Sequence, residues 1–141
     1  MSDALRRRIQ DYYQAYAEGR FDEVLAALDE NVVFVSYAPT EVFPVLGRRT
    51  GKAAVATTIN VMNAAFEHLN YQPIFMVVAD EEAAAIVLAR LRQRSTGRVI
   101  QVLLAHFLRF RDGRVVELRE FMDSFDAVQQ VLGREIDLSK V

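Results

Sequence analysis

The chain has 141 residues, of which 52% are hydrophobic and 26% are charged. A chain of roughly this length buries enough surface to fold without disulfides or metals, so we expect one domain over residues 1–141. The near balance of 17 basic and 19 acidic residues argues against a nucleic-acid partner. Because the sequence has no cysteine and two histidines, we expect no metal and no cofactor. It has neither a signal segment nor a long apolar run, which predicts a cytoplasmic protein without membrane contact.

The first half of the sequence has a helical hydrophobic period. Apolar residues recur at steps of three and four, as on the buried face of a helix. The elements predicted here are a helix ending near Gly19, a short helix over 21–28, a strand over 32–36 and a helix over 52–69. Residues 37–52 hold two of the three prolines and two of the six glycines, so we expect a loop that forms the rim of a pocket.

After Asn70 the pattern changes to strands rich in Val, Ile and Phe. The predicted strands are 71–80, 83–94, 98–111 and 114–123, followed by a helix over 124–132. Asp112 and Gly113 form the strongest hairpin signal, so these strands are expected to form an antiparallel meander. The fold class is therefore α+β: a curved antiparallel sheet wrapped around three N-terminal helices, in a cone or α+β barrel.

Three stretches, residues 9–32, 47–54 and 107–123, together with the order of elements, resemble the nuclear transport factor 2-like superfamily. This superfamily includes ketosteroid isomerases, limonene epoxide hydrolases and SnoaL-like polyketide cyclases. The resemblance implies a cystatin-like cone with a mostly apolar pocket, and members are often homodimers. It covers nearly the whole chain.

The resemblance also suggests roles for single residues. The oxyanion-hole tyrosine of ketosteroid isomerase corresponds to Tyr12, its general base falls near Ser36, and its second oxyanion acid falls near His106. The end of the last strand, from Arg119 to Asp123, is similar to the Arg-aromatic-Asp ending of limonene epoxide hydrolase. SnoaL-like cyclases, which need an aspartate base and an apolar pocket, are the nearest functional relatives implied.

His106, Asp123 and Arg119 are the polar residues that strand alternation singles out. His106 lies on an otherwise apolar strand face, so it is either a hydrogen-bonded core residue or a group that exchanges protons. Asp123 is either the cap of the last helix, an ion-pair partner of Arg119, or a pocket base that Arg119 orients. Pairing across the Asp112-Gly113 turn places Arg119 or Phe121 opposite His106.

Tyr12 and Tyr16 lie on the apolar face of the first helix. They either pack in the core or donate hydrogen bonds to an oxyanion in the pocket. Phe43 and Val45 of the rim loop are expected to roof this pocket, and Leu104 and Phe121 to line it.

The predicted function is general acid/base isomerisation, cyclisation or hydration of a hydrophobic small molecule. Asp123 would be the base, His106 and Tyr12 would donate or relay protons, and Arg119 would orient Asp123. The alternative is a small-ligand-binding module with the same cone and no catalysis. Leu103, Ala105 and Phe107 alternate outward among polar residues, which predicts a homodimer through the convex sheet face.

Overall fold

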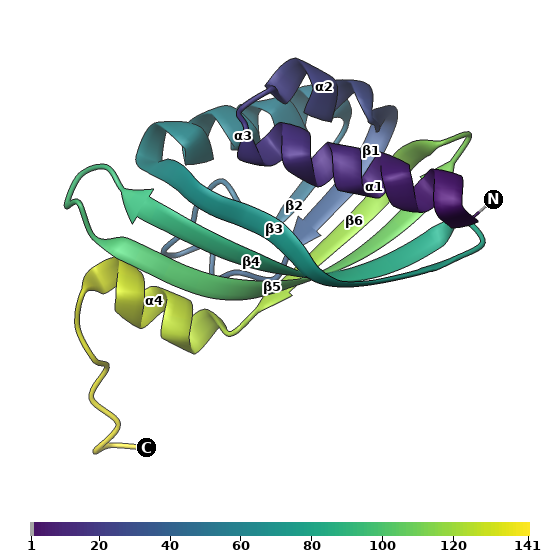
Figure 1. Cartoon of the computed structure of the whole chain (residues 1–141). Helices are drawn as coiled ribbons and strands as arrows, with labels where there is room; N and C mark the ends of the chain where they lie inside the picture. Colours follow the sequence, from purple (N-terminus) through teal and green to yellow (C-terminus); the bar gives the residue numbers. More distant parts are fainter. Residues whose placement is uncertain (1) are drawn as a thin grey trace.

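The computed structural model describes residues 2–141 and contains four helices and six strands within that range. In chain order they are α1 (Ser2–Ala17), α2 (Phe21–Ala26), β1 (Leu28–Ser36), β2 (Arg48–Thr50), α3 (Lys52–Ala65), β3 (Phe66–Ala79), β4 (Glu82–Gln93), β5 (Val99–Arg111), β6 (Arg114–Met122) and α4 (Ser124–Leu132). Helices α1, α2 and α3 lie together on one side of a curved sheet (Figure 1). This arrangement confirms the predicted α+β class.

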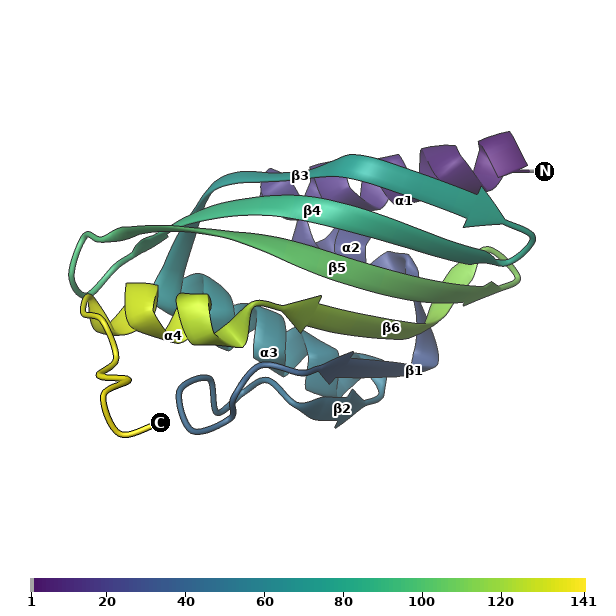
Figure 2. The ribbon, with the colours of Figure 1, turned by 90° about the horizontal axis from the view of Figure 1, so that it is seen from below.

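The strand order of the sheet is β2-β1-β6-β5-β4-β3, and the sheet is open at β2 and β3. Strands β3 to β6 form the predicted antiparallel meander, which Figure 2 shows from below. The first strand differs from the all-antiparallel expectation, because β1 pairs with β6 in parallel. The short strand β2, inside the predicted 37–52 loop, pairs with β1 through residues such as Arg49 and Thr50.

The third helix ends earlier than the sequence predicts. We expected it to continue to Leu69, but α3 stops at Ala65, and Phe66 has extended backbone angles of −133° and 137°. Phe66 continues the helical spacing of α3, yet it is buried as the first residue of β3. Residues 66–69 therefore belong to the sheet, which turns the His68 ring toward the interior cavity.

An extra residue in β6 changes the register of the last hairpin. Next to the turn, Phe110 pairs with Val115, as two turn residues require. One step further, Arg109 pairs with Glu117, so Val116 is the additional residue of a β-bulge. Beyond this bulge His106 lies opposite Glu120 instead of Arg119 or Phe121.

The main core lies between α1 and the concave face of the sheet. Leu5, Ile9 and Tyr13 recur at four-residue steps and form the buried stripe of α1. A second cluster, including Phe43, Leu46 and Ile100, lies where the 37–47 loop meets the sheet. No helix within residues 2–141 is both long and apolar enough to cross a membrane.

Helix α4 starts at an aspartate cap and packs against the start of β5. The Asp123 carboxylate accepts a 3.0 Å hydrogen bond from the Asp126 amide, and Gly133, with a φ of 69°, ends the helix. The Gln130 side chain forms two hydrogen bonds with the Gln101 backbone. These contacts fix α4 beside the sheet.

Replacing Asp123 with Ala should lower the free energy of unfolding by about 1 kcal/mol, because α4 loses its side-chain cap. Urea unfolding followed by circular dichroism measures this change. The matched control is Glu135→Ala, an exposed acidic residue just after the helix, which should change the free energy by a few tenths of a kcal/mol at most. Equal effects of the two substitutions would contradict the capping role.

Candidate active site

A cavity of about 120 Å³ lies between the helices and the concave face of the sheet. An apolar cavity of roughly 150 Å³ can hold a benzene ring, so this space suits a small ring compound. Most of its wall is apolar, supplied by α3, the 37–47 loop and the inner residues of β4, β5 and β6. Polar side chains enter it from α1, β3, β5 and β6: Tyr12, Tyr16, His68, Tyr71, His106 and Glu120.

A chain of hydrogen bonds runs through the buried wall of this cavity. The Tyr13 hydroxyl lies 2.7 Å from Nδ1 of His106, and Nε2 of His106 lies 3.0 Å from Oε1 of Glu120. The Ser36 hydroxyl donates a 2.8 Å hydrogen bond to Oε2 of Glu120. All four residues are at most 7% exposed. The chain links α1 to three residues from β5, β6 and β1.

The Tyr13 hydroxyl lies at one end of this series of hydrogen bonds. Burial, followed by the nearby Tyr12 hydroxyl and the Glu120 charge, raises the pKa of Tyr13 well above its ordinary value. Its hydroxyl therefore keeps its proton and can donate it to Nδ1 of His106. In the tautomer of His106 that accepts this bond, the proton on Nε2 is donated to Glu120.

Glu120 keeps hydrogen-bonding capacity on the cavity side. Each carboxylate oxygen can accept about two hydrogen bonds, and His106 and Ser36 occupy one position on each. Burial and then the charge of Glu120 raise the pKa of Tyr12, so its hydroxyl remains a donor. A carboxylate acceptor and a phenol donor therefore face the same apolar space.

Five of the residues singled out from the sequence line the cavity. They are His106, Tyr12, Tyr16, Phe43 and Leu104. Strand alternation places His106 and Leu104 on the inner face of β5, and the helical spacing of α1 places both tyrosines opposite the sheet. Their catalytic or binding roles remain predictions.

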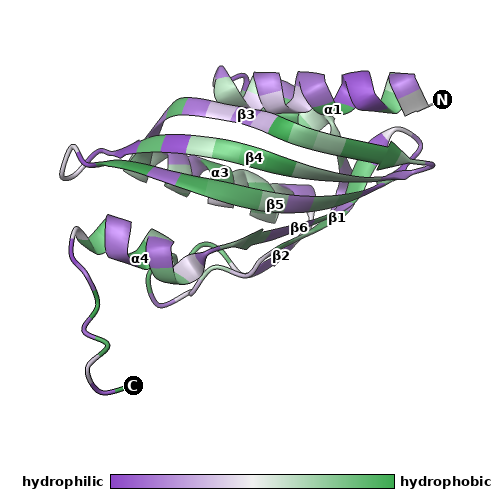
Figure 3. Cartoon of the chain, turned by 60° about the horizontal axis from the view of Figure 1, so that its bottom comes forward, coloured by the Kyte–Doolittle hydropathy of each residue, from purple (hydrophilic) through white to green (hydrophobic). Residues whose placement is uncertain are grey.

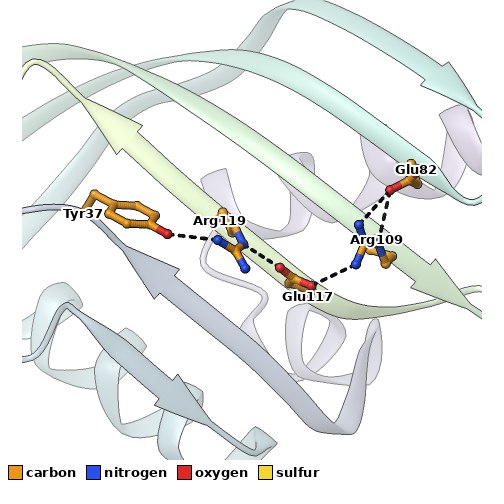
Figure 4. Close-up of polar contacts among 5 residues, drawn as sticks. All are labelled: Tyr37, Glu82, Arg109, Glu117 and Arg119. Atoms are coloured by element: carbon orange, nitrogen blue, oxygen red, sulfur yellow. Dashed lines mark hydrogen bonds and ion pairs between the residues drawn. The ribbon is translucent and has the colours of Figure 1, made fainter.

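Asp123 and Arg119 lie outside the cavity, contrary to the predicted site. Asp123 is exposed beyond the end of β6, where it caps α4. Arg119 points to the outer face of the sheet and contacts Glu117 and Tyr37, not Asp123 (Figure 4). The β-bulge explains the difference, because it reverses which residues of β6 face inward.

Phe121 and Val45 do not line the cavity either. Phe121 shares the outer face with Arg119 and stacks on the Tyr37 ring at a centroid distance of 4.2 Å. Val45 is half-buried beside the cavity residue Leu46, and its carbonyl accepts hydrogen bonds from Arg49 and Thr58. In the rim loop, Phe43 and Leu46 therefore line the cavity, and Val45, which was expected to line it, does not.

Glu120 is the main residue that the sequence interpretation missed. The sequence signal lay in the run Val115-Val116, where two adjacent β-branched residues break the alternation of β6. A β-bulge assigned at this point would have led to the prediction that Glu120 faces inward. Among residues 2–141, no three His, Asp or Glu side chains lie close enough together to hold a metal ion.

Tyr13→Phe should lower the free energy of unfolding by about 1–3 kcal/mol, because it leaves Nδ1 of His106 buried without a hydrogen-bond partner. Tyr12→Phe, one residue earlier, is the matched control: its hydroxyl has no hydrogen-bond partner among the described residues, so the expected loss is about 0.5 kcal/mol or less. Urea unfolding of both variants tests the difference. Equal losses would show that the Tyr13–His106 contact contributes nothing measurable.

Comparison with known proteins agrees with this architecture. The family model described as a SnoaL-like domain matches residues 9–118. A candidate isomerase from Rhodopseudomonas palustris is 32% identical, with a TM-score of 0.79 over 87% of this chain and 91% of that one.

Two further structures share the fold at 20% identity. A candidate isomerase from Bacillus subtilis has a TM-score of 0.80 over 96% of this chain and 97% of its own. A candidate polyketide cyclase from Xanthomonas campestris has a TM-score of 0.77 over 92% of this chain and 98% of its own. None of the curated proteins compared with the chain matches it. The family match and the first structure together show that this chain belongs to the SnoaL-like family of the nuclear transport factor 2-like superfamily.

Proposed function

We propose that the chain is an enzyme that moves a proton between two carbon atoms of a small hydrophobic carbonyl compound. The observation that carries this proposal is the Glu120 carboxylate, which is buried at the wall of an apolar cavity. The candidate isomerases among the similar structures agree with a reaction of this class.

The free-energy cost of burying the Glu120 carboxylate supports a chemical role for this residue. A buried charge costs several kcal/mol, and apolar residues of similar size usually serve stability equally well. Among the described residues no lysine or arginine forms an ion pair with Glu120, and the only basic group in contact with it is His106. A carboxylate held in this way in a cavity has the features of a general base.

The reaction begins when Glu120 removes a proton from the carbon next to the carbonyl group. The C–H bond breaks, an O–H bond forms on the carboxylate, and the electron pair moves to the carbonyl oxygen. Tyr12 donates a hydrogen bond to this developing oxyanion. The electron pair then returns from the oxygen, so that the carbonyl bond re-forms and the carbon–carbon double bond of the substrate shifts into conjugation with it. Glu120 gives its proton to the far carbon of the original double bond, which completes the isomerisation. Tyr13, His106 and Ser36 act as positioning residues for the carboxylate.

The test is the conversion of 3-cyclohexen-1-one to 2-cyclohexen-1-one, a one-ring ketone isomerisation followed by ultraviolet absorbance. The wild-type chain should accelerate it, and Glu120→Gln should lower the rate by at least about 10²-fold, because positioned proton transfer contributes about 10²–10⁴. Asp123→Asn is the matched control, since Asp123 lies outside the cavity, and it should retain the wild-type rate.

Two results would contradict the proposal. One is a Glu120→Gln rate equal to that of the wild type. The other is binding of the ketone, seen by NMR titration, with no acceleration over buffer, which would indicate the alternative of a non-catalytic ligand-binding module.

We further propose that two copies of the chain pair through the convex face of the sheet. Phe75, Ile86, Ala105 and Phe121 lie directly opposite one another across β3 to β6 and form one apolar row. Phe75 and Leu103 are each 55% exposed and Phe107 is 50% exposed. Figure 3 shows the hydrophobic residues of these strands from this side. An exposed apolar face of this kind, bordered by polar groups, is typical of a protein interface.

Phe107→Asp should convert the dimer to a monomer, because it places a charge in the apolar face. Sedimentation velocity at micromolar concentration should give about twice the 16.0 kDa chain mass for the wild type and the chain mass for the variant. Val61→Asp, on an exposed apolar residue of α3, is the control and should stay dimeric. A monomeric wild-type chain would contradict the proposal.

A further inference from the structure

A second polar cluster lines the cavity, in addition to the hydrogen-bonded residues Tyr13, His106 and Ser36 that hold Glu120. The Tyr16 ring lies 4.9 Å from the His68 ring and 4.6 Å from the Tyr71 ring, and His68 lies 5.6 Å from Tyr71. These centroid distances describe one packed group, which joins α1 to β3. All three residues line the cavity.

The polar atoms of this cluster have no partner within residues 2–141. Neither the Tyr16 and Tyr71 hydroxyls nor the His68 ring nitrogens form a hydrogen bond there. In the same part of the chain, every fully buried side-chain nitrogen or oxygen has a partner. The unpaired atoms of the cluster therefore face open space, where water or a bound ligand can form hydrogen bonds with them.

The cluster is uncharged near neutral pH. Burial raises the pKa values of Tyr16 and Tyr71, and the nearby phenols and Glu120 raise them further. Burial and then the charge of Arg94 lower the pKa of His68. The cluster therefore offers two phenol donors and a neutral imidazole, which can both donate and accept. The buried Glu120 lines the same cavity, whereas Arg94, the cation that acts on His68, is exposed and bonded to the Asn63 carbonyl. This environment therefore disfavours an anionic group in the cavity.

We infer that Tyr16, His68 and Tyr71 form a second subsite that binds a neutral oxygen group of the substrate, such as a hydroxyl or a second carbonyl. The substrate class is then a small ring ketone that carries oxygen at a second position, and a carboxylate or phosphate is rejected. This inference rests on the proposed function for the first carbonyl group. The subsite itself acts in binding and needs no catalysis.

The experiment compares the binding of four probes to the full chain by NMR titration: cyclohexanone, 3-hydroxycyclohexanone, 4-hydroxycyclohexanone and cyclohexanecarboxylate. At least one hydroxyketone should bind about 5- to 10-fold more tightly than cyclohexanone, the effect of about one hydrogen bond. Cyclohexanecarboxylate should bind more weakly than cyclohexanone.

Tyr16→Phe/Tyr71→Phe removes both hydroxyls and keeps the rings, so it should reduce the hydroxyketone advantage to less than about 2-fold, with the Kd of cyclohexanone unchanged. His68→Phe preserves an aromatic ring and should also reduce the ratio by which the hydroxyketone binds more tightly than cyclohexanone. Tyr37→Phe, which removes a hydroxyl on the outer face, is the matched control and should leave it intact.

Glu120→Gln separates this inference from the proposed function, because the hydroxyketone advantage should persist in a variant that lacks the base. The inference is overturned if neither hydroxyketone binds more tightly than cyclohexanone, or if the advantage survives in the double variant. Tighter binding of the carboxylate than of cyclohexanone would also overturn it, since that result requires a cationic subsite.

Discussion

The hydrogen-bonded pair of His106 and Glu120 depends on one extra residue in β6. Because side chains alternate along a strand, a single inserted residue moves every later residue to the opposite face. Val116 takes this place, and the change of register turns Glu120 inward and Arg119 outward. The same shift thus places a carboxylate in the cavity wall, where the unshifted register would have placed an arginine. Strand bulges often aim a side chain in this way beside a functional site.

The structure separates its charges between the two faces of the sheet. On the outer face, Arg109 and Arg119 alternate with Glu82 and Glu117, and these four charges pair with one another at the water-exposed surface (Figure 4). On the inner face, Glu120 is surrounded by apolar groups and by the hydrogen-bonding side chains of Ser36 and His106. Charge interactions are stronger where water is excluded. A small redistribution of charge in a bound molecule therefore changes its interaction energy with the protein more inside the cavity than at the surface.

The sequence predicted the helices, the meander and the inward direction of His106, because these follow from hydrophobic period and from the Asp112-Gly113 turn. It placed Asp123 and Arg119 wrongly, because a bulge leaves the hairpin turn unchanged while it shifts the strand beyond it. It also missed His68, because Met62, Phe66 and Leu69 fit a helical spacing even though the last two belong to β3. The parallel pairing of β1 with β6 joins segments far apart in the sequence, and no local pattern specifies it.

The parallel contact between β1 and β6 also bears on the order of folding during synthesis. The meander of β3 to β6 consists of neighbouring hairpins, which can form early because their contacts are local. Ser36 and Glu120, in contrast, are 84 positions apart, and Tyr13 and His106 are 93 apart. On the ribosome, α1 can pack against β3 as soon as that strand emerges, whereas β1 must wait for its parallel neighbour β6. The groups that hold Glu120 in place thus come together only at the final closure of the sheet.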